Sequence, residues 1–170
     1  SRDRLLKATS TRTLRRNWDY IKLHYPNVRM KNGDVTDIEQ LKEASKDVDA
    51  IIHTAAQVAV TTALVDPKVD FEINALGTFN VLEVARLLDA AVIFTSTNKV
   101  YGDNVNKIPV KEKGERYVFA DPKFKHGIPE DFSIDHCGHS PYGASKLSGD
   151  IYVQDYAHSY GLSTTIFRMS

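Results

Sequence analysis

The chain has 170 residues, of which 22 are lysine or arginine and 22 are aspartate or glutamate, so its formal net charge is zero. This length suits one domain with a sizeable core, or part of a larger protein. The balanced charge argues against nucleic acid as the main partner, because binding to phosphates normally needs a basic face.

The cysteine content and the hydropathy of the chain indicate in which cellular compartment the protein is found. Cys137 is the only cysteine, so the chain can form no internal disulfide, which favours a reducing compartment. No apolar run reaches the roughly 18–20 residues of a membrane span, and residues 1–20 are too polar for a signal peptide. We therefore expect a cytoplasmic protein that does not act at a membrane.

The first residues are locally basic. The stretch "SRDRLLKATSTRTLRRNW" (1–18) carries one acid, Asp3, against six cations: Arg2, Arg4, Lys7, Arg12, Arg15 and Arg16. We interpret it as the solvated face of a helix. A phosphate-facing role for one or two of the arginines is the alternative.

Apolar, β-branched runs alternate with helix-like stretches along the rest of the chain. They predict strands at 27–35 (with a turn), 49–56, 90–96 and 162–170, and helices at 37–48, 66–89 and 140–161. Thr36 or Asp37 would cap the first helix, Pro67 lies in the first turn of the second, and Gly161 ends the third. This order predicts an α/β fold, a doubly wound parallel sheet with helices on both faces.

Ligands of such sheets bind at the carboxyl ends of the strands. Polar residues gather at three of these ends, at Gly33-Asp34, from His53 to Gln57, and from Ser96 to Lys99. His53 itself lies inside a predicted strand, and we expect it to be a packed core residue or to face a cofactor. The sequence thus predicts a ligand site along one edge of the sheet.

Residues 103–135 break the alternation. They hold two glycines and three prolines and show no long period. A connection of this length is usually a functional loop or disordered. Its four aromatic rings, at Tyr117, Phe119, Phe124 and Phe132, argue against full disorder. We expect an ordered flap over the substrate side.

Tyr142 and Lys146 are four residues apart on a predicted helix and therefore share a face. A tyrosine with the usual pKa of about 10 is a poor base at neutral pH, but a neighbouring ammonium stabilises the phenolate. Thr97 or Ser96, at the end of the preceding strand, could supply a second hydroxyl to the same substrate oxygen. A tyrosine and a lysine at this spacing are weak evidence for a catalytic site on their own, because many surface helices contain such a pair. The position of this pair after the strand and the stretch "TSTNKVYG" (95–102) strengthens the evidence.

The motifs "SPYGASK" (140–146) and "TSTNKVYG" (95–102) resemble the extended short-chain dehydrogenase/reductase superfamily of nucleotide-sugar epimerases and dehydratases. "NGDVTD" (32–37), "HTAAQVAV" (53–60) and "DPKVDFEINALGTFNVLE" (66–83) resemble further landmarks of that superfamily. The resemblance implies a Rossmann-like fold, NAD as the cofactor, a nucleotide sugar as the substrate, and a homo-oligomer.

The resemblance also implies roles for single residues. Tyr142 would be the catalytic base, Lys146 would hold the cofactor ribose and tune Tyr142, and Thr97 would bind the reacting oxygen. The substrate-binding residues would be Thr97, Asn98 and Tyr142. The cofactor-binding residues would be Asp34, Val35, Ala55, Ala56, Gln57, Asn74, Thr95, Tyr142 and Lys146.

Within the superfamily, four longer stretches resemble the CDP-paratose (CDP-tyvelose) 2-epimerases: 55–74, 96–103, 114–135 and 139–146. That family inverts C2 of a CDP-dideoxyhexose by transient oxidation. Ala63 and Ala144 depart from its serine and cysteine, which leaves other nucleotide sugars open. Asn98-Lys99 stands where the dehydratase branch has Asp-Glu, so the acid and base needed to eliminate water are lacking.

The superfamily's glycine-rich phosphate loop is not in the chain, whose first glycine is Gly33. The strand whose acidic residue selects NAD over NADP is also lacking. We therefore expect residues 1–170 to be a partial NAD-binding domain with a flap at 103–135, inactive alone. Alternatives are another epimerase or reductase, or a non-catalytic remnant. "HCGH" (136–139) is too tight for a metal site, and we expect no metal.

Overall fold

The computed structural model describes the backbone of residues 11–170 and the side chains from residue 16 onward. The chain divides into two compact units, residues 1–32 and 33–170. The first contains helix α2 (Thr11–His24). Arg16 is exposed on it, as a solvated helix face requires. The other five cations of the basic stretch lie outside the residues whose side chains are described.

The strand predicted at 27–35 is wrong. Residues 25–37 form turns and irregular backbone, and Val28 is exposed. The nearest strand along the chain, β1 (Ala50–His53), pairs on one side with β2 (Ala91–Thr97), and no described strand pairs with residues 27–35. A strand needs a neighbour for its hydrogen bonds, so the local apolar pattern was not enough.

Helix α3 (Ile38–Ala44) begins where the sequence predicted and ends earlier. The Asp37 carboxylate accepts hydrogen bonds from the backbone N–H groups of Glu39 and Gln40, both at 3.1 Å, and so caps the helix. Of the two candidates, Asp37 and not Thr36 is therefore the N-cap residue. The helix closes at Ser45, three residues before the predicted end.

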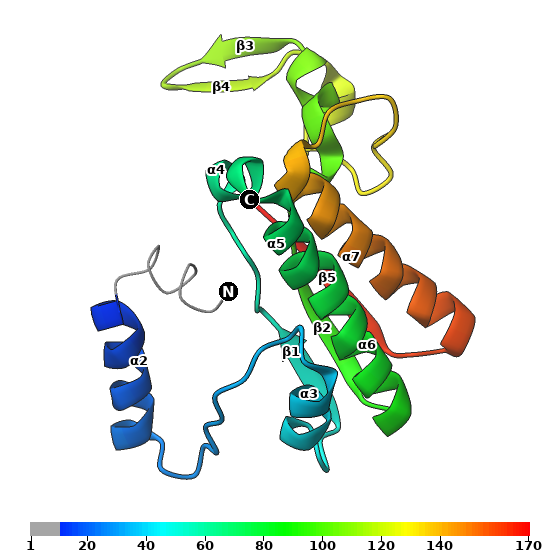
Figure 1. Ribbon diagram of the computed structural model, residues 1–170. Helices are drawn as coiled ribbons and strands as arrows, with labels where there is room; N and C mark the ends of the chain where they lie inside the picture. Colours follow the sequence, from blue (N-terminus) through cyan, green and yellow to red (C-terminus); the bar gives the residue numbers. More distant parts are fainter. Residues whose placement is uncertain (1–10) are drawn as a thin grey trace. The chain divides into compact units, whose positions relative to one another are not determined.

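The central sheet contains three parallel strands, β1 (Ala50–His53), β2 (Ala91–Thr97) and β5 (Thr164–Met169), in the order β1-β2-β5. All three lie within the predicted strands or within one residue of them. Their carboxyl ends point toward α4 and the start of α7 (Figure 1). This is the edge at which the sequence predicted a ligand site.

Helices α6 (Gly77–Leu88) and α7 (Ser140–Tyr160) pack on one face of the sheet and bury the core. The core residues are Leu82, Ala85, Val92, Phe94, Val153, Tyr156 and Leu162. On the opposite face Ile52, Phe167 and Met169 are 66%, 52% and 57% exposed. In the unit 33–170, therefore, both long helices cover the same face. The predicted cover on the other face is not found in this unit.

The helix predicted at 66–89 is one run of helical backbone in three parts, α5 (Pro67–Phe71), a π-helical turn η1 (Glu72–Leu76), and α6. A short helix, α4 (Val60–Val65), precedes it. Asp66 caps α5 by accepting from the Val69 N–H at 3.2 Å. The π-turn contains Asn74, and such turns occur frequently at functional sites.

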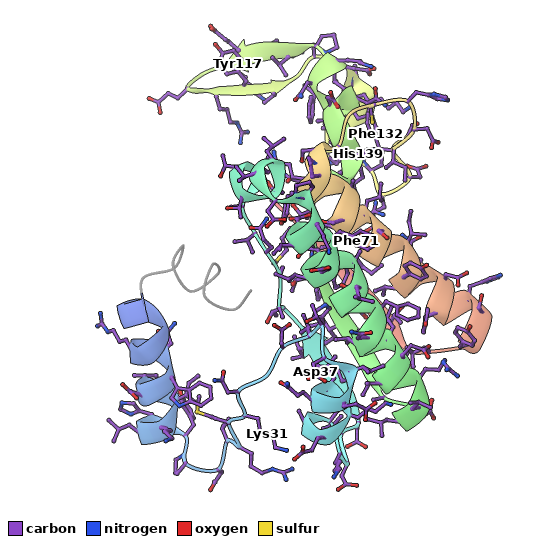
Figure 2. The ribbon with its side chains drawn as sticks, viewed as in Figure 1. Lys31, Asp37, Phe71, Tyr117, Phe132 and His139 are labelled. Atoms are coloured by element: carbon purple, nitrogen blue, oxygen red, sulfur yellow. The ribbon has the colours of Figure 1, made fainter. Side chains whose placement is uncertain are left out.

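Residues 98–139 are ordered and contain a hairpin that the sequence did not predict. The 3₁₀ segment η2 (Asn98–Lys107) is followed by antiparallel strands β3 (Val110–Lys113) and β4 (Arg116–Phe119), and by η3 (Pro122–Phe124). The Phe132 ring meets the rings of Tyr101 and Phe124 edge to face. Phe132 lies near the start of α7, apart from the hairpin that carries Tyr117 (Figure 2). That this segment covers a substrate remains a prediction.

None of the helices among residues 11–170 combines the length and the hydropathy that crossing a membrane requires.

A glycine lets α7 approach η2. A Cβ atom on Gly143 would lie 2.9 Å from the backbone oxygen of Lys99 and 3.3 Å from Cβ of His139. Backbone atoms cannot move aside as a flexible side chain can. Gly143 therefore allows the start of α7 to pack directly on the turn that follows β2.

Replacing Gly143 with alanine should destabilise the fold by about 1–3 kcal/mol, because the new methyl group overpacks this contact. Alanine is otherwise favoured over glycine in a helix by about 1 kcal/mol. Urea unfolding of the 170-residue chain measures the change. The exposed neighbour Ala144→Gly is the control and should lose only the helix preference. A Gly143→Ala variant more stable than the parent chain would contradict the contact.

Candidate active site

Lys146 extends from α7 to the carboxyl end of β2. It is 3% exposed, and its Nζ donates a hydrogen bond to the backbone oxygen of Thr95 at 2.7 Å. Nζ also lies 4.2 Å from the centroid of the Phe94 ring. The lysine that the sequence singled out is thus buried, and its ammonium is fixed at the strand end.

Burial lowers the pKa of Lys146 to about 8, because a charged ammonium loses its hydration. The negative charges of Asp150 and Asp70 act in the opposite direction and limit the fall. At neutral pH the side chain remains mostly protonated, so it can stabilise a negative charge that forms beside it.

Tyr142 lies one turn before Lys146 on α7 and is 9% exposed. Thr97 ends β2 and is 8% exposed; its Oγ1 accepts from the Lys99 N–H at 3.3 Å and so caps η2. Because α7 packs on η2 at Gly143, the residue next to Tyr142, the segments that carry Tyr142 and Thr97 are in contact. The predicted trio therefore comes from the end of β2 and the first two turns of α7.

Ser96 was the other candidate for the second hydroxyl. Its Oγ donates to Oδ2 of Asp150 at 2.6 Å, on the face of β2 that packs against the helices. Oγ1 of Thr97, the next residue along the strand, instead lies at the start of η2, where it accepts from the Lys99 N–H. This favours Thr97 over Ser96 as the hydroxyl available to a ligand.

Asp150 is fully buried and forms an ion pair that the sequence did not reveal. Nε and Nη2 of Arg168 donate to its two carboxylate oxygens at 3.0 and 2.9 Å. Burial raises the pKa of Asp150, but the hydrogen bonds from Arg168 and Ser96 outweigh it and lower the pKa overall. Nη1 of Arg168 also donates to the backbone oxygen of Glu130 at 3.0 Å, which ties the 98–139 segment to β5.

Four buried polar residues, Gln57, Asp70, Asn74 and Ser145, form a network between three segments. The Gln57 N–H donates to Oδ1 of Asn74 at 2.9 Å, and Nδ2 of Asn74 donates back to the Gln57 oxygen at 3.0 Å. Nε2 of Gln57 donates to Oδ1 of Asp70 at 2.8 Å. Of the predicted cofactor residues, Asn74 thus holds the backbone of Gln57 through its side-chain amide.

The remaining predicted cofactor residues lie on the turns before α3 and after β1. Oδ1 of Asp34 accepts from the N–H and the hydroxyl of Thr36, at 3.0 and 2.9 Å, and its carboxylate is exposed. Nδ2 of Asn80 donates to the Val35 oxygen at 3.0 Å and anchors this turn to α6. Ala55 and Ala56 follow β1 in irregular backbone. Asn98, predicted to bind substrate, is exposed at the start of η2.

The stretch 136–139 holds the base of the 98–139 segment. Sγ of Cys137 donates to the Ile134 oxygen at 3.4 Å, and Nε2 of His139 lies 2.8 Å from the same oxygen. His139 and Phe132 lie beside the first turn of α7 (Figure 2). Among the described residues, no group of three His, Cys, Asp or Glu side chains is arranged to hold a metal ion.

A cleft of about 780 Å³ opens between η2 and the start of α7. Its lining includes Asn98, Lys99, Tyr101, His139 and Arg168. The cleft has the size of a small-molecule site. It adjoins the strand end that carries Thr97, so the geometry suits a substrate bound on this side.

His53 is a buried, neutral histidine. Thr78 Oγ1 donates to the Asn74 oxygen at 2.6 Å, so its 3.0 Å contact with Nε2 of His53 requires that Nε2 carry the proton. Burial, and next the charge of Lys146, lower the pKa of His53 to about 4. The expectation of a packed core residue is confirmed, since His53 is 4% exposed and stacks on Phe94.

This histidine should make stability pH-dependent. The unfolded chain takes up a proton at the ordinary pKa of 6.5, whereas the folded chain resists until about 4. Stability is therefore full above pH 6.5 and falls toward pH 4, by at most about 3 kcal/mol. Urea unfolding at pH 7 and pH 5 measures the loss. His53→Phe should reduce it, and the exposed control His126→Gln should not; equal slopes in both variants would contradict this assignment.

Comparison with known proteins identifies the family. Residues 3–170 match the model of the NAD dependent epimerase/dehydratase family. The chain belongs to that family. Its Rossmann-like α/β fold follows from the same match and from the solved structures below.

Members of the family resemble this chain closely over their shared part. The chain is 44% identical over 124 residues to the CDP-paratose 2-epimerase of Salmonella typhi. This match covers 72% of the chain and 35% of the epimerase. A crystal structure of the dTDP-glucose 4,6-dehydratase from Streptomyces venezuelae with NAD bound matches with a TM-score of 0.70 and 29% identity, over 91% of this chain and 41% of that one.

A second structure, the UDP-glucose 4-epimerase of Thermus thermophilus in complex with NAD, matches with a TM-score of 0.56 and 31% identity. The match covers 80% of this chain and 39% of that protein. The chain thus spans less than half the length of these three family members. Both of the solved relatives contain NAD.

Proposed function

We propose that this chain carries the catalytic residues of an NAD-dependent nucleotide-sugar epimerase that inverts C2 of a CDP-linked deoxyhexose. The observation that carries the proposal is the buried pair of Tyr142 and Lys146, with the Lys146 ammonium fixed at the end of β2 two residues from Thr97. The similarity to CDP-paratose 2-epimerase supports the choice of sugar and of carbon.

The residues present suit NAD at the sheet edge. The Lys146 ammonium has three N–H donors, of which Thr95 takes one, so others are available to ribose hydroxyls. The exposed carboxylate of Asp34 can accept from an amino group of the adenine. NAD, when bound, would supply the acceptor for a hydride from the sugar and return it. Gln57 and Asn74 would contribute to the cofactor site indirectly. The Asn74 side chain holds the Gln57 backbone, and the Gln57 side chain holds the Ala59 backbone.

The chemistry assigned to the side chains is a reversible proton transfer. Tyr142 takes the proton of the C2 hydroxyl as the carbon loses its hydride, which leaves a 2-keto sugar. The Lys146 cation stabilises the phenolate of Tyr142 before the transfer, and Thr97 holds the reacting oxygen. When the ketone is reduced from its other face, Tyr142 returns the proton and C2 is inverted.

Two alternatives differ in substrate or in reaction. Ala63, one of the departures from the CDP-paratose 2-epimerases, is fully buried in α4. This departure and the one at Ala144 leave a different nucleotide sugar as the first alternative. A 4,6-dehydratase would need a carboxylic acid and a carboxylate after Thr97. Asn98 and Lys99 provide neither, which favours an epimerase. A third alternative is a non-catalytic remnant.

A homo-oligomer is part of the proposal. Three large side chains on α6 and α7, Leu87, Ile151 and Tyr152, are 63%, 49% and 43% exposed. Apolar side chains on the outer faces of these two helices support a helix-mediated interface between copies of the protein.

Tyr142→Phe in the full-length protein should lower turnover by at least about 100-fold, because the proton acceptor is lost. NAD binding should persist, since the ring and Lys146 remain. Turnover is measured on a panel of CDP-, dTDP- and UDP-linked sugars, which also separates the substrate alternatives. Tyr160→Phe, which changes an exposed tyrosine at the far end of the same helix, is the control. Full activity in Tyr142→Phe would refute the assigned base.

The 170-residue chain on its own should bind NAD weakly. It contains no glycine-rich loop at a helix N-terminus to hold the pyrophosphate. Isothermal calorimetry should show no saturation at micromolar NAD. Saturation in that range, lost in Lys146→Ala, would overturn this expectation and support a self-sufficient cofactor site.

A further inference from the structure

Arg168, in β5, makes contacts that the proposed reaction does not use. Its Nε and Nη2 donate to the Asp150 carboxylate of α7 at 3.0 and 2.9 Å, and its Nη1 donates to the backbone oxygen of Glu130 at 3.0 Å. Its guanidinium carbon lies 5.0 Å from the centroid of the Tyr101 ring in η2. One planar group therefore contacts α7 and two parts of the 98–139 segment.

The Asp150 side of this junction fixes the face of α7 that carries the proposed base. Tyr142, Lys146 and Asp150 follow one another at intervals of four residues, so they lie along one face of the helix. Asp150 is fully buried, and its Oδ2 also accepts from Oγ of Ser96 in β2 at 2.6 Å. Because two parallel hydrogen bonds define a plane, the pair with Arg168 allows little rotation of this face.

The other side of the junction holds the wall of the 780 Å³ cleft, which both Tyr101 and Arg168 line. A second hollow, of about 310 Å³, is lined by residues 130–135 together with Leu147, Ile151, Gln154 and Arg168. The space between this segment and α7 is therefore not filled by packed side chains. In the described part of the chain, the bond to Glu130 is the only hydrogen bond that joins residues 128–133 to the sheet.

The junction depends on the shape of the arginine side chain. A lysine could pair with Asp150, but its ammonium is a single point charge on a flexible stem. It could not hold the Asp150 carboxylate, the Glu130 oxygen and the Tyr101 ring together in fixed directions. The planar guanidinium, and not positive charge alone, therefore makes the connection.

We propose that Arg168 is a positioning residue that couples the wall of the substrate cleft to α7, and so sets the distance between the bound sugar and Tyr142. The inference rests on the proposed function for its effect on the sugar, and it deepens that function by naming the residue that joins the substrate side to the helix of the base. The coupling itself is a property of the fold and can be measured without turnover.

The variant Arg168→Lys removes the coupling and keeps the charge. The Phe132 N–H reports on the wall, because it donates to the Pro129 oxygen at 3.0 Å, next to Glu130. Hydrogen–deuterium exchange of the full-length protein is followed by mass spectrometry. Peptides that cover residues 128–134 should exchange at least about 10-fold faster in the variant than in the parent protein. Equal exchange in the two proteins would overturn the proposal.

Arg86→Lys is the matched control. Nε and Nη2 of Arg86 donate to the Glu83 carboxylate, both at 3.0 Å, and its guanidinium carbon lies 5.1 Å from the centroid of the Tyr160 ring. The control thus loses the same kinds of contact at a site that lines neither hollow. Exchange of residues 128–134 should stay at the parent rate. An effect as large as that of Arg168→Lys would indicate a general loss of stability and overturn the proposal.

Kinetics separate positioning from a merely structural role. In Arg168→Lys, the KM for the nucleotide sugar that the parent protein turns over fastest should rise by at least about 10-fold. The Kd for NAD, measured by calorimetry, should stay within about twofold, because Arg168 forms no hydrogen bond or ion pair with the proposed cofactor residues. An unchanged KM, or an equal loss of NAD affinity, would overturn the proposal.

A second variant covers the case in which Arg168→Lys does not fold. Tyr101→Leu removes the ring on the cleft side and leaves the ion pair with Asp150 intact. It must then show the faster exchange of residues 128–134 with unchanged NAD affinity, and exchange at the parent rate overturns the proposal. If neither variant folds, the junction is a packing element of the fold and the proposal is overturned.

The two readouts also separate this inference from the proposed function. Faster exchange in Arg168→Lys, in a protein that turns over no sugar of the panel, would uphold the coupling and overturn the proposed function. Exchange and KM at parent values, in a protein that loses its turnover in Tyr142→Phe, would uphold the function and overturn this inference alone.

Discussion

The arrangement of the candidate site depends on one buried hydrogen bond, from the Lys146 ammonium to the Thr95 backbone oxygen. An ammonium cannot be buried without acceptors and negative charge around it. The bond therefore requires α7 to lie against the end of β2, and it brings Tyr142 to the same edge of the sheet. Glycines at 143 and 149 make the approach possible, since a Cβ at either position would press on η2, Thr78 or Phe94.

Two buried carboxylates flank this bond in different ways. Asp150 is held by Arg168 and Ser96, so it joins α7 to β2 and β5. Asp70 is held by neutral donors and joins α7 to the segment after β1. The first is a structural ion pair, and the second is a hydrogen-bonded junction between three segments. The polar layer between the helices and the strand ends thus fixes geometry and electrostatics at once.

Local features of the fold could be predicted from the sequence, and features that need a distant partner could not. The Asp37 cap, the Gly161 end of α7 and the shared face of Tyr142 and Lys146 depend on residues within one or two turns. The strand expected at 27–35 failed because a strand depends on its neighbour. The Asp70–Ser145 contact, which joins residues 75 apart in sequence, left no local sign.

The hairpin was missed for a different reason. Its strands are rich in lysine, glutamate and arginine, and the first is exposed along its whole length, so no apolar alternation marks it. The family resemblance supplied expectations that periodicity could not, namely the proposed roles of Thr97, Asn74 and Asp34. For Gln57 and Asn74 the structure adds that the Asn74 side chain binds the Gln57 backbone N–H and oxygen.

The contacts of Arg168 distinguish two parts of the 98–139 segment, a base that contacts Arg168 and the β3–β4 hairpin. At the base of the segment, the Arg168 guanidinium contacts Asp150, the Glu130 backbone oxygen and the Tyr101 ring. The Tyr101 ring also belongs to a cluster with Phe132 and Phe124. The β3–β4 hairpin joins this cluster only through β4, whose Phe119 ring lies 5.8 Å from the Phe124 ring, while all four residues of β3 are exposed. The wall of the cleft therefore belongs to the base, at Tyr101, His139 and Arg168, and the lining of the cleft includes no residue of the hairpin, so changes in the hairpin sequence would leave that wall intact.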